Sequence, residues 1–218
     1  MKINIRNGSL IVGFLIFTLG VSSCGKRSDD TDVLQAAENT AKEIQLMGTW
    51  ESECGGAKLL GAPNKHYYNF TGDTFVDAYD LYFGQTDCQD SSAMLSYEGS
   101  FKLGEVIEKN DARKIDFEYK NRVFLKPFTE AGANHLNSIS FCGITDWKQN
   151  VAKDLTHKGG IVCGLLHNTI PETKKNIIKI EDDQLFFGAS YGIELTKQRP
   201  ESLDMKNAYK KSNRTLTY

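Results

Sequence analysis

The chain has 218 residues, of which 40% are hydrophobic and 11% aromatic, and its formal net charge is −2. This length suits one globular domain with appendages, and the composition excludes a disordered chain. Because the charge is nearly balanced and no basic stripe is present, nucleic acid is not expected as a partner.

Residues 1–23 have the layout of a secretory signal. Lys2 and Arg6 precede an apolar run at 10–19, and the small residues 21–23 follow it. The run is shorter than the roughly 20 residues that a membrane span needs. We therefore expect export, with the mature chain beginning after this segment.

The stretch Val21-Ser22-Ser23-Cys24 resembles the lipobox of bacterial lipoproteins, in which Leu is preferred where Val21 stands. The resemblance implies that Cys24 is the lipidated N-terminus and that the membrane is a partner through this lipid. Several acyl chains together anchor a protein stably. The alternative is a plain signal peptide cut near Ser23. Gly25 and Lys26 differ from the Asp signal for inner-membrane retention, which favours the outer membrane of the cell envelope.

Residues 24–45 predict a tether followed by a spacer helix. The part before Thr31 is polar and charged, which is typical of a solvated linker. Apolar residues then recur at helical spacing on one face: Leu34, Ala37, Ala41 and Ile44. A spacer that carries the domain is favoured over a helix that binds a partner.

Residues 46–218 predict one all-β domain, a small antiparallel β-barrel or sandwich of about eight strands. We expect strands at 47–54, 66–70, 74–83, 93–103, 114–120, 122–126, 176–180 and 184–188, and a closing strand within 199–211. Hairpin turns are expected at 71–73 and 181–183, a loop at 55–65 and a turn at Asn121. Residues 127–175 break the rhythm, and there we expect a short helix at 129–137 within an irregular insertion.

Four cysteines remain once Cys24 is assigned to lipid: Cys54, Cys88, Cys142 and Cys163. In an exported protein they are expected to pair, and three connectivities are open. We favour Cys54–Cys88, which joins the opening strand to the turn after the aromatic hairpin. Cys142–Cys163 would then staple the irregular insertion. A metal site is disfavoured, because CxxC and paired-histidine spacings are lacking.

The sequence offers no motif for catalysis or for a cofactor. Its four histidines are isolated, namely His66, His135, His157 and His167. GxSxG, HExxH, GxGxxG and Walker patterns are all missing. The acidic run 181–183 is expected to be a solvated hairpin turn rather than a calcium site. We therefore predict neither an enzyme nor a bound metal or cofactor.

Gly48-Thr49-Trp50 resembles the Gly-x-Trp signature of lipocalins and related calycins. The resemblance implies a β-barrel whose floor is closed by Gly48 and Trp50 under an arginine from near the end of the last strand. Arg199 and Arg214 are the candidates for that arginine, and the sequence does not choose firmly between them. Further segments at 70–75, 142–147 and 199–204 resemble a group of uncharacterised bacterial lipoproteins, and this likeness supports the favoured disulfides.

The expected function is binding of a small apolar or amphipathic ligand inside the barrel. Aromatic side chains would line the interior, with Tyr67, Tyr79, Tyr97 and Phe117 as the candidate ligand contacts. The alternative is an interaction or adhesion module with a filled core, which would meet an envelope protein through residues 128–175. A hydrolase is the least favoured class, since no nucleophile and base stand out.

Overall fold

The computed structural model describes residues 44–59, 61–85, 87–156, 173–189 and 198–216. The strands are β1 (Gly48–Ser52), β2 (Gly55–Leu59), β3 (Ala62–Thr71), β4 (Thr74–Leu81), β5 (Ala93–Ile107), β6 (Ala112–Pro127), β7 (Lys153–Asp154), β8 (Thr173–Glu181), β9 (Gln184–Phe187) and β10 (Tyr209–Ser212). They are joined by the helix α2 (Glu130–Ser138) and the 3₁₀ turn η1 (Phe141–Gly143).

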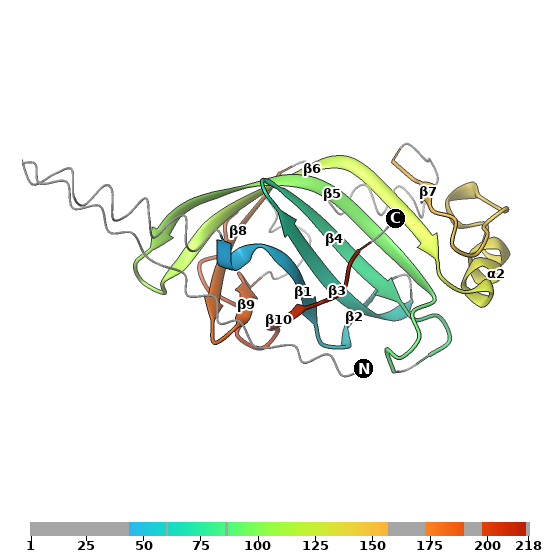
Figure 1. Ribbon diagram of the computed structural model, residues 1–218, viewed down its shortest axis with the longest axis horizontal. Helices are drawn as coiled ribbons and strands as arrows, with labels where there is room; N and C mark the ends of the chain where they lie inside the picture. Colours follow the sequence, from blue (N-terminus) through green and yellow to red (C-terminus); the bar gives the residue numbers. More distant parts are fainter. Residues whose placement is uncertain (1–43, 60, 86, 157–172, 190–197, 217–218) are drawn as a thin grey trace, which may run out of the picture. The chain divides into compact units, whose positions relative to one another are not determined.

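Eight of these strands close into an antiparallel barrel, in the order β1-β10-β9-β8-β6-β5-β4-β3, with β3 pairing back onto β1 (Figure 1). The short strands β2 and β7 add to β3 and β6 at the margins. The predicted all-β barrel is therefore confirmed. Residues 44–46 are helical, whereas Cys24 and the rest of the predicted signal, tether and spacer helix lie outside the described residues.

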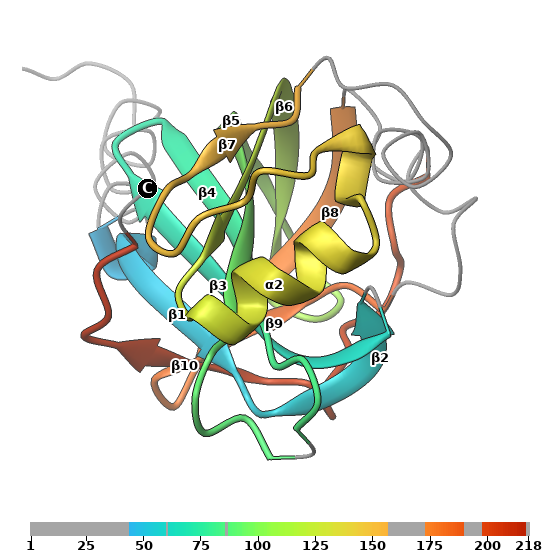
Figure 2. The ribbon, with the colours of Figure 1, turned by 90° about the vertical axis from the view of Figure 1, so that its right-hand side faces the viewer.

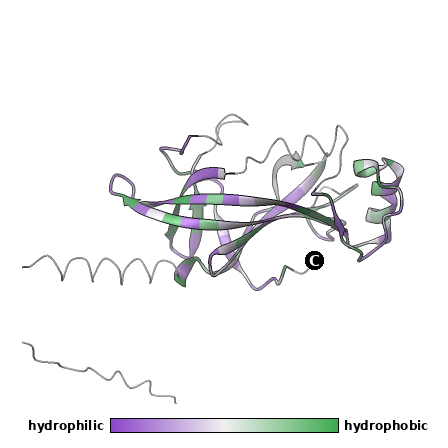
Figure 3. Ribbon diagram, turned by 90° about the horizontal axis from the view of Figure 1, so that it is seen from above, coloured by the Kyte–Doolittle hydropathy of each residue, from purple (hydrophilic) through white to green (hydrophobic). Residues whose placement is uncertain are grey.

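Alternation of side chains along each strand separates the barrel interior from its outer surface. In β5, for example, Leu95 and Tyr97 are buried in the main core while Glu98 and Lys102 are not. Residues of opposite hydropathy alternate along the long strands in Figure 3. A two-residue turn at Gly72 and Asp73 joins β3 to β4, and Gly72 has the positive φ of 58° that such a turn needs. This hairpin was predicted and is confirmed.

Two predicted irregularities are wrong. The expected loop at 55–65 instead forms β2 and the start of β3, which pair with a shifted register. The expected turn at Asn121 lies within β6, which runs unbroken from Ala112 to Pro127. Glu98 of β5 pairs with Arg122, whereas Gly99 pairs with Tyr119, so the residues between Tyr119 and Arg122 form a bulge. A bulge bends a strand without ending it, which helps the long β5–β6 hairpin to curve around the barrel.

The helix α2 lies across one end of the barrel (Figure 2). Thr129 caps it by accepting a hydrogen bond from Gly132 N to its Oγ1 at 2.9 Å. Ala133 and Leu136 are buried against the main core. The side chain of Asn137 binds both the backbone N and O of Trp147, at 2.7 and 3.0 Å. The predicted helix at 129–137 is thus confirmed, within one residue.

The disulfide Cys54–Cys88 is present, with Cα atoms 5.7 Å apart, and it ties the end of β1 to the β4–β5 loop. Cys142 is also disulfide-bonded, and its predicted partner Cys163 lies outside the described residues.

Aromatic side chains fill the deep core of the barrel. Four of them are at most 1% exposed: Trp50, Phe70, Phe75 and Phe117.

Candidate ligand-binding cavity

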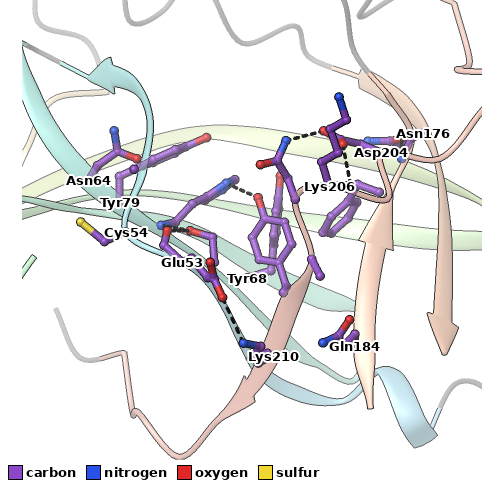
Figure 4. A pocket seen from close by; sticks show the side chains of 18 of the residues that line it. Glu53, Cys54, Asn64, Tyr68, Tyr79, Asn176, Gln184, Asp204, Lys206 and Lys210 are labelled. Carbon is purple, nitrogen blue, oxygen red and sulfur yellow. Dashed lines mark hydrogen bonds and ion pairs between the residues drawn. The ribbon is translucent and has the colours of Figure 1, made fainter. Parts of the chain in front are cut away.

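A cavity of about 570 Å³ opens where β1 ends and β3, β8 and β10 begin. Aromatic rings contribute to its lining, namely those of His66, Tyr68, Tyr79, Phe187 and Tyr209. Figure 4 shows Cys54, Asn64 and Tyr79 on one side, with Asn176, Asp204 and Gln184 facing them from the other. The cavity therefore combines flat apolar ring faces with many polar atoms.

His66 lies at the centre of a hydrogen-bonded chain that spans three strands. Its Nε2 is 2.7 Å from Oδ1 of Asp77 on β4, and its Nδ1 is 2.6 Å from the hydroxyl of Tyr209 on β10. The imidazole also stacks on the ring of Tyr79, with 4.1 Å between ring centroids and 10° between planes. The position and orientation of the imidazole are thus set on both edges and on one face.

The two-residue turn of the β3–β4 hairpin brings these groups together. It sets the register in which His66 lies opposite Tyr79 and Tyr68 lies opposite Asp77. Directly opposed residues of an antiparallel pair share a face, and so do residues two apart on one strand. All four side chains therefore point into the barrel.

Asp77 is buried, and its second oxygen accepts a hydrogen bond from the Tyr119 hydroxyl at 2.8 Å. Burial alone would raise the pKa of Asp77. When His66 is protonated, its charge and its hydrogen bond, with smaller contributions from Lys174 and Tyr119, outweigh burial and lower that pKa. Asp77 is thus a carboxylate that only accepts hydrogen bonds.

The ionised carboxylate determines which His66 nitrogen carries hydrogen. Because Asp77 can only accept, the hydrogen-bond network assigns the proton to Nε2 of His66. In the neutral imidazole Nδ1 is then an acceptor, so Tyr209 donates its hydroxyl hydrogen to it. Burial raises the pKa of Tyr209 and of Tyr79, so both stay protonated across the physiological range.

Lys174 brings a positive charge to the cavity wall. It lies opposite the core residue Phe117 in the β8–β6 register, which places it on the inner face. Among the described residues the side chain of Lys174 makes neither an ion pair nor a hydrogen bond, although its charge acts on Asp77. At the rim, by contrast, Lys210 Nζ is 3.1 Å from Glu53 Oε1.

The predicted ligand contacts are only partly brought together. Tyr79 lines the cavity, whereas Tyr97 and Phe117 are buried behind the lining rings. The Tyr97 ring meets that of Tyr79 edge-on at 6.5 Å, and the Phe117 ring is 5.9 Å from that of Tyr68.

Tyr67 does not line the cavity, and its predicted place in the barrel interior is wrong. It precedes Tyr68 on β3 and so points to the other face, where it packs with Ala78 and Met94 outside the main core. Its hydroxyl accepts a hydrogen bond from Arg214 Nη1 at 3.0 Å. The sequence did not resolve this, because aromatics occur on both faces of the hairpin.

The residues expected to close the barrel are also partly corrected. Trp50 is buried, and its Nε1 donates to Leu46 O at 2.7 Å, while Gly48 starts β1 with a φ of 101°. The cation over the Trp50 ring is Lys211, with Nζ 4.1 Å from the ring centroid. Lys211 lies directly opposite Trp50 in the β1–β10 register, which explains its place.

Neither candidate arginine lies over the Trp50 ring. Arg199 instead donates to the backbone O of Ile115 at 3.1 Å and pairs with Asp116 at 2.5 Å. This ties the segment before β10 to the β6 and β8 part of the wall. Arg214 lies on the outer face, against Tyr67.

Sequence reasoning missed His66, Asp77, Lys174 and Tyr209 as members of one site. A usable signal was present for the first two, because a two-residue turn at Gly72 and Asp73 fixes the pairing of the β3–β4 hairpin. No local pattern links Tyr209 to His66, which is 143 residues away. That contact depends on closure of the barrel.

Comparison with known proteins adds no identification. The chain matches no protein-family model, and no curated protein is significantly similar to it. Within the described ranges, no helix has both the length and the apolar character to cross a membrane. The same ranges hold no group of three or more His, Cys, Asp or Glu side chains suited to a metal ion.

Proposed function

We propose that this barrel binds a small amphipathic molecule in the cavity around His66. The observation that carries the proposal is the cavity itself, whose walls combine stacked rings with hydrogen-bonding groups. Its volume of about 570 Å³ is in the range of small-molecule sites. Ring faces favour a flat or apolar portion of a ligand, and the polar groups fix its orientation.

The character of the lining favours an amphipathic ligand over a purely apolar one. An apolar molecule would strip water from polar groups such as Asn176, Lys174 and the Tyr209 hydroxyl without replacing those hydrogen bonds. Each unsatisfied polar group costs about 1–3 kcal/mol. A ligand with its own polar atoms avoids that cost.

The ligand would occupy the mouth of the barrel rather than its depth. Trp50, Phe70 and Phe75 fill the lower interior and are 1% exposed. The alternative is an interaction module with a filled core. The filled part of the core is compatible with it, but the open cavity favours small-molecule binding.

The location of this activity is a separate part of the proposal. We infer from the lipobox-like stretch ending at Cys24 that the barrel is tethered by lipid to the bacterial envelope. The Cys54–Cys88 disulfide supports an oxidising compartment. The calycin-like Gly-x-Trp at 48–50 is consistent with an exported binding barrel. Cys24→Ala is expected to release the protein from membranes, and unchanged membrane partitioning would refute the anchor.

Native mass spectrometry of protein purified from its host tests the binding proposal. Wild-type protein is expected to carry a small molecule that is lost on unfolding. Ala208→Trp places a large ring in the cavity lining and is expected to remove that molecule. Met205→Trp is the matched control, since Met205 is 53% exposed on the same segment and does not line the cavity. An apo mass for wild type, or equal ligand loading of both variants, would contradict the proposal.

A further inference from the structure

The charges around the cavity make its ligand preference more specific. Groups that can carry charge face His66 from five strands: Tyr68 on β3, Asp77 and Tyr79 on β4, Tyr119 on β6, Lys174 on β8 and Tyr209 on β10. The tyrosines are neutral, because burial raises the pKa of each of them. The remaining charges that face His66 are the Asp77 carboxylate and the Lys174 ammonium. Four more charged side chains line the cavity, and among them Glu53 and Asp204 balance Lys206 and Lys210.

The charges of Asp77 and Lys174 balance when His66 is neutral. A ligand carboxylate placed near Lys174 would leave the partly enclosed wall with an excess negative charge. Protonation of His66 removes that excess, and the proton has a ready place, because Nδ1 is the unprotonated nitrogen of the neutral ring.

Protonation of His66 also reverses the hydrogen bond to Tyr209. In the neutral state the Tyr209 hydroxyl donates its hydrogen to Nδ1 and offers only lone pairs to the cavity. In the protonated state Nδ1–H donates to the Tyr209 oxygen, and the hydroxyl hydrogen becomes free to turn toward a ligand. Tyr209, which lines the cavity, thereby changes from an acceptor into a donor.

We propose that the ligand carries a carboxylate that is held by Lys174 and Tyr209, and that its binding adds one proton to Nδ1 of His66. This rests on the proposed binding function and deepens it. The proton comes from solvent and returns there when the ligand leaves. The ring faces of Tyr68, Tyr79 and Phe187 suit an acid with a flat or apolar body.

Isothermal titration calorimetry with pairs of acids and amides tests the preference. The probes are indole-3-acetate, benzoate and decanoate, each with its matched amide. We expect at least one acid to bind about tenfold or more tightly than its amide, since a hydrogen bond to a charged group is worth that much. Equal affinity of every acid and its amide would overturn this inference and leave the binding proposal standing. Failure of all six probes to bind would count against this inference alone if native mass spectrometry shows a bound molecule, and against both if it shows none.

Neighbouring lysines on β8 give a matched pair of variants. Lys174→Gln removes the charge on the inner face, and Lys175→Gln removes one from the exposed outer face. Lys174→Gln is expected to lower acid affinity about tenfold and so to abolish the preference for the acid, whereas Lys175→Gln is expected to preserve that preference. An equal loss in both variants would show that only the overall charge matters, and would overturn the site.

Titrations in phosphate and in Tris at pH 7 measure the proton. These buffers differ in ionisation enthalpy, so proton uptake appears as a difference in apparent binding enthalpy. Wild type is expected to take up close to one proton per bound acid, and His66→Gln none. Should His66→Gln fail to fold, Tyr209→Phe replaces it and is expected to lower the uptake. The same enthalpy in both buffers for wild type would overturn the coupling.

Discussion

Arg214 binds the side chain of Asp80 on the outside of the barrel, although the two residues are 134 positions apart in the chain. The Asp80 side chain has no exposed surface, and its Oδ1 accepts a hydrogen bond from Arg214 Nη2 at 2.9 Å. The backbone O of Arg214 accepts a further hydrogen bond from Thr49 Oγ1, also at 2.9 Å. The residues after β10 therefore form a strap over β3 and β4 that depends on this ion pair.

Removing Arg214 is expected to be costly for stability. Arg214→Ala leaves the Asp80 carboxylate buried without its cation, which typically costs about 3–5 kcal/mol. Arg122→Ala is the control, because Arg122 is 55% exposed and its pair with Glu98 is worth about 0–1 kcal/mol. Urea unfolding measures both. Similar losses for the two variants would show that the strap is not held by Asp80.

Acid sensitivity should depend on Asp77. Its pKa in the folded state is below the ordinary value of 3.8, so it stabilises the fold fully above that value, and this contribution is lost as the pH falls through the folded pKa. In Asp77→Asn the free energy of unfolding is expected to fall less steeply below about pH 4 than in wild type. Asp73→Asn, in the exposed β3–β4 turn, serves as the control and should follow wild type. Parallel acid profiles for wild type and Asp77→Asn would contradict the assignment.

The disulfide Cys54–Cys88 is expected to contribute about 3–4 kcal/mol, since it closes a loop across a sequence separation of 34 residues. The double variant Cys54→Ala/Cys88→Ala should show this loss in urea unfolding under oxidising conditions. Wild type under the same oxidising conditions provides the comparison. Because Cys54 also lines the cavity, ligand affinity should fall in the variant as well. An unchanged unfolding midpoint would show that the bridge adds no constraint.

Gly99 and Phe75 provide a packing test in the barrel wall. They are cross-strand neighbours, and a Cβ on Gly99 would clash with the Phe75 ring and with the backbone O of Glu118. Gly99→Ala is expected to cost about 1–3 kcal/mol through overpacking. Gly104→Ala on the same strand meets its nearest atom at 3.0 Å and should cost less. Thermal unfolding measures the loss of stability in both variants. A larger loss for Gly104→Ala than for Gly99→Ala would contradict this packing.

Much of the barrel could be predicted from alternation and turn residues. The β3–β4 hairpin, the β8–β9 hairpin and the α2 cap at Thr129 all have local signals. The cavity site had no local sequence signal of comparable strength, because His66, Lys174 and Tyr209 come from strands that meet only when the sheet closes. The cation over Trp50 shows the same limit. Lys211 occupies that place because β10 pairs with β1 in a register that only the closed barrel determines.

A crystal structure of protein isolated from its host would show whether the cavity holds a ligand. We expect electron density for a small molecule in the cavity between His66, Tyr79 and Tyr209, with a polar group near Lys174. Density for a ligand elsewhere, or ordered water alone in the cavity of protein that native mass spectrometry shows to be loaded, would contradict this expectation.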